Sequence, residues 1–144
     1  MGQIQVSQYQ VTWFNFSIKP RKKMSNMTIP IPSPKAVIID DEIDTCLLLG
    51  MVLKKFGIVS SRAHTLADGL QKVAEEQPMF IFLDNNLPDG VGVEKMDLFR
   101  AQAPGAKLFM ITAMSNLREL ALQLGADGFV EKPLSTEKIE TVLR

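Results

Sequence analysis

The sequence predicts an α/β fold, doubly wound, in which helices cover both faces of a parallel β-sheet. Short apolar runs recur along the chain without the alternation of a half-exposed strand, as expected for strands buried on both faces. Amphipathic segments separate these runs, and a polar side chain directly follows most of them. Five such strand and helix pairs predict a five-stranded sheet.

The elements follow one another in regular order. We expect strands near residues 36–40, 58–62, 79–83, 107–111 and 127–130, and helices near 43–56, 66–76, 92–102, 115–124 and 135–143. Gly57 and Gly125 stand where helices commonly end, because glycine readily adopts the left-handed conformation there. Helical spacing in the fourth helix is shown by Leu117, Leu120, Ala121 and Leu124.

Residues 1–34 are expected to form an N-terminal extension, followed by a compact domain over 35–144. Three prolines within 30–34 disfavour a helix and predict an extended linker. The β-forming residues before the linker are compatible with a strand or hairpin that adds to the sheet edge of another chain. The other interpretation is a flexible tail, or an upstream stretch preceding a true start at Met24 or Met27.

Composition narrows the classes of function. The chain has 144 residues with 46% hydrophobic content, enough for one core. All 16 acidic but only 12 of the 16 basic residues lie in 35–144, which gives this part a net charge of −4 and argues against nucleic acid as its partner. The single cysteine, Cys46, cannot form an intramolecular disulfide, and no apolar segment is long enough for a membrane span. We therefore expect a cytoplasmic protein without a membrane partner.

Five polar residues each follow an apolar run at the point where a strand is expected to end. They are Asp40, Asp41, Asp84, Thr112 and Lys132. In an open parallel sheet, the residues just beyond the carboxyl ends of neighbouring strands meet in one crevice. The sequence therefore predicts a site with three carboxylates, a hydroxyl and an ammonium group.

Four stretches match a known family in both order and spacing. They cover residues 38–42, 81–90, 111–113 and 125–134. Together they give the compact domain a resemblance to the receiver domain of response regulators in two-component phosphosignalling. This resemblance implies a flavodoxin-like (βα)5 fold with the strand order 2-1-3-4-5.

The three carboxylates predict a divalent metal, because without a cation they would raise one another's pKa. Mg²⁺ fits this expectation, with Mn²⁺ as an alternative, since it binds through one or two carboxylates together with phosphate oxygens. The resemblance implies that Asp41 and Asp84 are metal ligands and that Asp40 acts largely through water. It also implies that Asn86 contributes its backbone carbonyl.

The resemblance identifies Asp84 as the phosphoacceptor, because a carboxylate can attack a phosphoryl group in line. The other interpretation, a third metal carboxylate, is compatible with the first. Lys132 would neutralise the phosphoryl charge, and Thr112 would hydrogen-bond a phosphoryl oxygen or the local backbone. We expect the Lys132–Pro133 peptide bond to be cis, as the resemblance implies. Such a module catalyses only its own phosphorylation and dephosphorylation.

The resemblance also implies a switch. Thr112 would move toward the phosphoryl group and Phe129 would rotate behind it, which remodels the face built from the last two helices and the strand between them. Phe129 is equally compatible with an ordinary core position. Asn86 and Met114 lie two residues after the phosphoacceptor and the threonine, where we expect them to tune the lifetime of the phosphoryl group.

The predicted function is a phosphoacceptor module of a two-component system. Its expected donor is a histidine kinase or histidine phosphotransfer protein, and its target is a downstream protein or an output domain in trans, with a phosphorylation-dependent homodimer as a further state. The alternative is a receiver-like scaffold that works without phosphorylation. A haloacid dehalogenase-like phosphatase would need an acid where Asn86 stands. A flavin-binding protein is disfavoured because Asp40, Asp41 and Glu42 would repel a phosphate.

Overall fold

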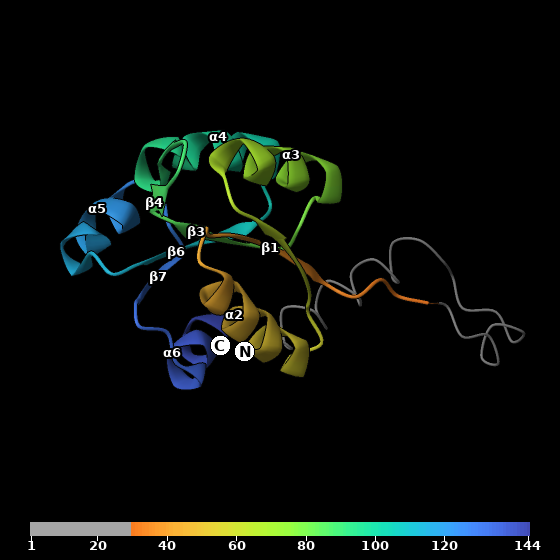
Figure 1. The fold of residues 1–144 in the computed structure, drawn as a ribbon. Coiled ribbons are helices and arrows are strands. Elements are labelled where there is room, and N and C mark those ends of the chain that lie inside the picture. The colour runs from red at the N-terminus through yellow and green to blue at the C-terminus, as the bar shows by residue number, and fades with distance from the viewer. Residues whose placement is uncertain (1–29) are drawn as a thin grey trace, which may run out of the picture.

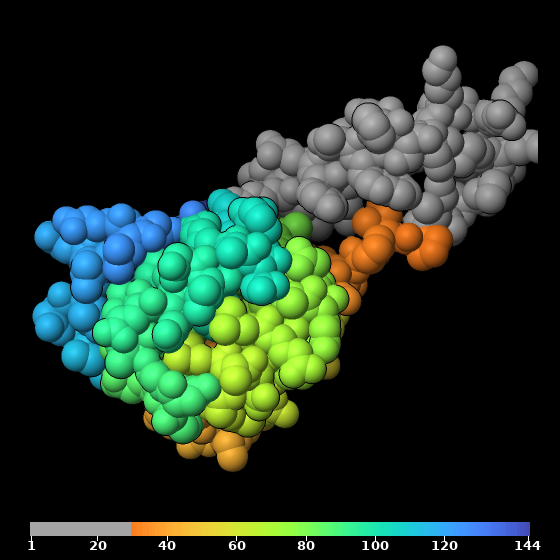
Figure 2. All heavy atoms as spheres, turned by 90° about the horizontal axis from the view of Figure 1, so that it is seen from above, coloured from red at the N-terminus to blue at the C-terminus, as the bar shows by residue number. Residues whose placement is uncertain are grey.

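The computed structural model describes residues 30–144. Residues 30–34 have no regular secondary structure and run outward from the compact body (Figures 1 and 2). The expected strand or hairpin, and the alternative starts at Met24 and Met27, lie outside the described residues.

Five parallel strands form the central sheet. They are β1 (Lys35–Ile39), β2 (Val59–Ala63), β3 (Phe80–Asp84), β6 (Lys107–Thr112) and β7 (Gly128–Glu131). Their order is β2-β1-β3-β6-β7, and every pair of neighbours is parallel. Counted along the chain this is the order 2-1-3-4-5, so the predicted flavodoxin-like fold is confirmed.

Helices cover both faces of the sheet (Figure 1). On one face lie α2 (Ile43–Lys55) and α6 (Thr136–Leu143), and on the other lie α3 (Leu66–Glu76), α4 (Met96–Gln102) and α5 (Arg118–Gln123). Figure 2 looks onto the second face. The helices expected at 92–102 and 115–124 each begin with a 3₁₀ turn, η2 (Gly92–Lys95) and η3 (Ser115–Leu117). None of the helices within 30–144 is long and apolar enough to cross a membrane.

A small antiparallel hairpin after β3 was not anticipated. It consists of β4 (Asn86–Leu87) and β5 (Gly90–Val91). The carboxylate of Asp89 in its turn accepts hydrogen bonds from the backbone N–H groups of Leu66 (2.8 Å) and Ala67 (3.0 Å). These bonds lower the pKa of Asp89. The hairpin is thereby attached to the start of α3, which holds the loop after β3 in place.

The core consists of two apolar layers, one on each face of the sheet. In the layer under α2 and α6, the ring of Phe109 lies 6.2 Å from that of Phe80 and 5.3 Å from that of Phe82, between centroids. In the other layer α3 approaches β1 so closely that a Cβ atom on Gly69 would lie 2.6 Å from Cγ1 of Ile39. Such dense packing fixes the strand ends that carry the polar residues.

Candidate functional site

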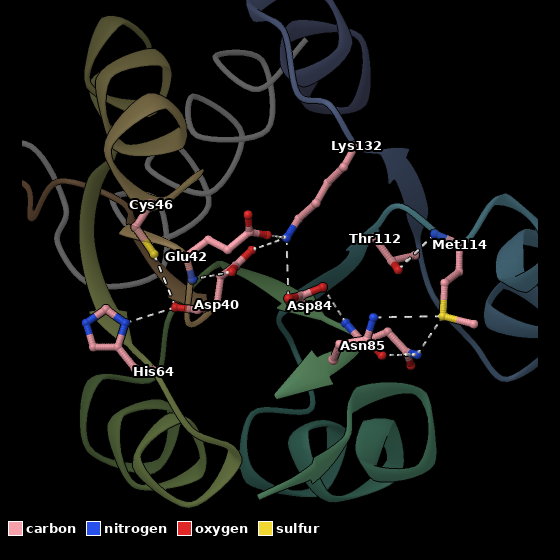
Figure 3. Close-up of polar contacts among 10 residues, drawn as sticks. Asp40, Glu42, Cys46, His64, Asp84, Asn85, Thr112, Met114 and Lys132 are labelled. Atoms are coloured by element: carbon pink, nitrogen blue, oxygen red, sulfur yellow. Dashed lines mark hydrogen bonds and ion pairs between the residues drawn. The ribbon is translucent and has the colours of Figure 1, made fainter. Parts of the chain in front are cut away.

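The register of the sheet gathers polar side chains at the carboxyl ends of the strands (Figure 3). Asp84 is the last residue of β3 and Thr112 the last of β6, while Asp40 directly follows β1. Lys132 follows β7 and extends its side chain toward the carboxylates of Asp40 and Asp84. The structure thus brings together the residues that the sequence placed at one crevice.

Three carboxylates form the acidic centre of the site. Asp40, Asp41 and Asp84 each place an oxygen within 4.8 Å of the other two. Asp40 and Asp84 are buried and Asp41 is exposed, so the cluster opens to solvent on one side. Lys132 Nζ lies 2.9 Å from Asp40 Oδ2 and 3.4 Å from Asp84 Oδ2, and it also pairs with Glu42.

Burial dominates the electrostatics of this cluster. It raises the pKa of Asp84 to about 6, to which the neighbouring charge of Asp40 contributes. Burial also raises the pKa of Asp40, although the hydrogen bond from the backbone N–H of Glu42 lowers it in part. For Lys132, burial alone would lower the pKa, but hydrogen bonds to Glu42 and Asp40 raise it above its ordinary value. Lys132 therefore stays cationic in the acidic site.

The donor set suits a hard divalent cation. Asp40 Oδ2 is buried and, apart from its ion pair with Lys132, lacks a well-directed hydrogen bond within residues 30–144. Its other oxygen, Oδ1, accepts a hydrogen bond of 2.8 Å from the backbone N–H of Glu42. Carboxylate oxygens in this number are the ligands that Mg²⁺ and Mn²⁺ prefer. A cation beside them would offset the repulsion that burial intensifies.

The loop after β3 is closed tightly behind Asp84. The backbone N–H of Asn85 donates to Asp84 Oδ1 (2.8 Å), and that of Gly92 donates to the carbonyl of Asn85 (2.7 Å). A Cβ atom on Gly92 would lie 2.2 Å from the Asp84 carbonyl oxygen, so only glycine fits there. Asn86 begins β4 and is exposed at the rim of the site.

The remaining predicted residues lie beside the carboxylates. Thr112 is buried, and its Oγ1 accepts a 3.1 Å hydrogen bond from the backbone N–H of Met114. Phe129 packs in the core layer under α3, α4 and α5, with the Arg118 guanidinium 5.8 Å from its ring centroid. The Lys132–Pro133 peptide bond is cis.

Two further side chains support the loop after β1. The His64 ring donates from Nδ1 to the Asp40 carbonyl (2.9 Å), and the Cys46 thiol lies 3.4 Å from the same oxygen. Burial, with a contribution from the charge of Asp40, raises the pKa of Cys46 to about 11, which keeps the thiol protonated. Both residues therefore hold the backbone of Asp40.

Reasoning from the sequence did not identify two residues of the site. Glu42 pairs with Lys132, and its position directly after two aspartates was the available signal. Asn85 is buried beside Asp84, and its amide lies against Asn86 and Met114. A single asparagine in a polar run carries no pattern that would have distinguished it.

Comparison with known proteins agrees with this geometry. The family model described as the response regulator receiver domain matches residues 36–144. The photosynthetic apparatus regulatory protein RegA of Rhodovulum sulfidophilum is 25% identical over 112 residues, which cover 76% of this chain and 61% of that protein. The transcriptional regulatory protein PrrA of Mycobacterium leprae is 30% identical over 109 residues, covering 74% of this chain and 47% of PrrA.

A solved structure shows the same fold. The beryllofluoride-activated NtrC4 receiver domain dimer superposes with a TM-score of 0.70 at 29% identity, over 76% of this chain and 92% of that one. The chain belongs to the response regulator receiver domain family, whose members are phosphoacceptor modules of two-component signalling. It spans 61% of the length of RegA and 47% of the length of PrrA.

Proposed function

We propose that this domain receives a phosphoryl group on Asp84 from a phosphohistidine donor, with Mg²⁺ bound beside it. The observation that carries this proposal is the position of Asp84: its buried carboxylate pairs with Lys132 and belongs to the cluster formed with Asp40 and Asp41. The ammonium group of Lys132 and a bound Mg²⁺ would together neutralise the charge of an incoming phosphoryl group. Mn²⁺ is an alternative ion.

The metal would be held by Asp41 and Asp84 together with the backbone carbonyl of Asn86, and Asp40 would act largely through water. The exposed position of Asp41 supports this assignment, because an ion at the open side of the cluster can keep several water ligands. When bound, the ion supplies positive charge to the phosphoryl oxygens.

In the transfer, an Asp84 oxygen forms a bond to phosphorus as the bond from phosphorus to the donor imidazole nitrogen breaks, and the electron pair returns to that nitrogen. Lys132 stabilises the charge on the phosphoryl oxygens. Thr112 Oγ1 accepts from the Met114 backbone, which leaves its own hydrogen free to donate to a phosphoryl oxygen. The domain catalyses its own phosphorylation and dephosphorylation and turns over no external substrate.

The output would be a changed protein-binding face formed by α5, β7 and α6. Exposed leucines are found on and next to α5: Leu120 and Leu122 of the helix and Leu124 just after it are 43%, 42% and 52% exposed. Thr112 and Phe129 would connect it to the phosphoryl group. Phe129 is already packed in the core, so its contribution would be a shift of packing against Arg118 on α5.

The partners follow from this scheme. The donor would be a histidine kinase or a histidine phosphotransfer protein, and the target a downstream protein or an output domain in trans. The beryllofluoride-activated NtrC4 receiver domain is described as a dimer, which supports a homodimer as a further state of this chain.

Intact-protein mass after incubation with acetyl phosphate tests the proposal. We expect a gain of one phosphoryl group with Mg²⁺, no gain with EDTA, and no gain in Asp84→Asn. A matched control, Asp97→Asn, changes an exposed aspartate on α4 and should gain the group as the wild type does. A folded wild type that gains nothing would instead support a scaffold that works without phosphorylation.

A further inference from the structure

One buried polar side chain of the site has no role in the scheme above. The buried polar residues within 30–144 are Asp40, Asp84, Asn85 and Thr112. The first, second and fourth serve the metal, the phosphoryl group or both. Asn85 is 3% exposed, directly follows the phosphoacceptor, and has an uncharged side chain. A buried amide is costly unless its polar atoms are used, so its contacts indicate what it does.

The orientation of the Asn85 amide is fixed by the backbone. Its Oδ1 accepts a 3.1 Å hydrogen bond from the N–H of Val93, which only an oxygen can do. Nδ2 must then point the other way, where it lies 3.5 Å from Asn86 Oδ1 and 3.6 Å from Met114 Sδ. Both of these atoms are acceptors and suit an N–H donor.

The contact with Asn85 also orients the side-chain amide of Asn86. With Oδ1 of Asn86 directed toward Asn85, the Nδ2 group of Asn86 lies 3.9 Å from Met114 Sδ. Asn85 thus contacts Asn86 in its own loop after β3 and Met114 in the loop after β6. These are the two side chains expected to tune the lifetime of the phosphoryl group.

We propose that Asn85 is a positioning residue that orients the amide of Asn86 and the thioether of Met114, and thereby sets the rate at which phosphorylated Asp84 is hydrolysed. The inference rests on the proposed function. In hydrolysis a water oxygen bonds to phosphorus, the bond from phosphorus to the Asp84 oxygen breaks, and the carboxylate leaves with the electron pair. A proton of the water passes to solvent. An Asn86 amide of fixed orientation can hold that water in line.

The test measures loss of the phosphoryl group after the donor is removed, with Mg²⁺ present, by intact-protein mass. We expect Asn85→Leu to slow this loss about fivefold, which corresponds to ~1 kcal/mol of barrier. In the Asn86→Ala background the same change should have no further effect, because the amide that Asn85 orients is gone. Asn116→Ser, an exposed asparagine in η3, should leave the rate unchanged.

A second variant separates orientation from support of the loop. If Asn85→Leu fails to fold, Asn85→Ser takes its place in the test. Its hydroxyl is too short to reach Asn86 and leaves the site uncharged, so this variant should also slow hydrolysis. An equal effect of the Asn85 variants with and without Asn86 would assign Asn85 to the loop alone and overturn the inference, as would an unchanged rate. A wild type that takes up no phosphoryl group would overturn the proposed function first, and the inference with it.

Discussion

The Asp84→Asn substitution tests the electrostatics of the site in the metal-free protein. Burial, together with the charge of Asp40, raises the pKa of Asp84 from 3.8 to about 6, so the ionised carboxylate destabilises the fold near neutral pH. Asparagine has nearly the same shape and no charge. In EDTA at pH 8 we therefore expect the variant to be more stable than the wild type.

The magnitude follows from the pKa of Asp84. At ~1.36 kcal/mol for each pKa unit, the rise from 3.8 to about 6 corresponds to about 3 kcal/mol of unfolding free energy. That pKa already includes the attraction of Lys132, whose Nζ lies 3.4 Å from Asp84 Oδ2. A stabilisation of about 3 kcal/mol is therefore the expected result.

The gain should depend on pH with a definite sign. A carboxyl whose folded pKa lies above its unfolded value supports the folded state fully below the unfolded pKa, and this support is lost as the pH rises through the folded pKa. The wild type should thus lose stability between pH 3.8 and about 6 relative to Asp84→Asn. The two proteins should have similar stability at pH 4 and differ fully above pH 7, to within about a unit.

Urea unfolding followed by circular dichroism in EDTA, from about pH 4 to 8, measures this difference. Asp97→Asn serves as the control for loss of an exposed aspartate. Added Mg²⁺ should stabilise the wild type more than Asp84→Asn and so reverse their order or narrow the gap. Equal stability at pH 8, or a difference that does not change with pH, would refute the electrostatic reasoning.

Three other substitutions test separate parts of the site. Gly92→Ala should destabilise the fold by about 2 kcal/mol or more in urea unfolding, because its Cβ would lie 2.2 Å from the Asp84 carbonyl oxygen. Gly105→Ala is the control and should be nearly neutral, because no atom lies within 4 Å of the added Cβ. Asp41→Asn should weaken Mg²⁺ binding about tenfold by calorimetry, and unchanged affinity would remove Asp41 from the ligands. Lys132→Met should cost about 3 kcal/mol at pH 8 in EDTA, because two buried carboxylates lose their cation, and Mg²⁺ should restore part of it. An equal loss at pH 5 would contradict that explanation.

The strands and the acidic cluster were accessible from the sequence for a physical reason. A strand buried on both faces leaves a continuous apolar run, and parallel pairing places all the carboxyl ends at one edge. Asp40, Asp84 and Lys132 could therefore be placed together without knowledge of any side-chain conformation.

Features that depend on tertiary contacts were less accessible. Spacing marked Leu120 and Leu124 as part of an amphipathic helix together with Ala121, yet only Ala121 is buried and both leucines are exposed. The helix packs against the sheet through a narrow stripe, which periodicity cannot measure. The β4–β5 hairpin has two residues in each strand, too few for any pattern. The role of Asn85 depends on the Val93 N–H, eight residues away.

The burial of Cys46 makes the protein convenient for single-site labelling. It is the only cysteine in the sequence, and its raised pKa of about 11 keeps the thiol unreactive toward alkylating reagents. A cysteine introduced at Gly105, which is exposed and precedes β6 at the end of the sheet opposite Asp84, would be the accessible thiol among residues 30–144. A fluorophore attached there would report folding or assembly while the phosphoacceptor site stays chemically untouched.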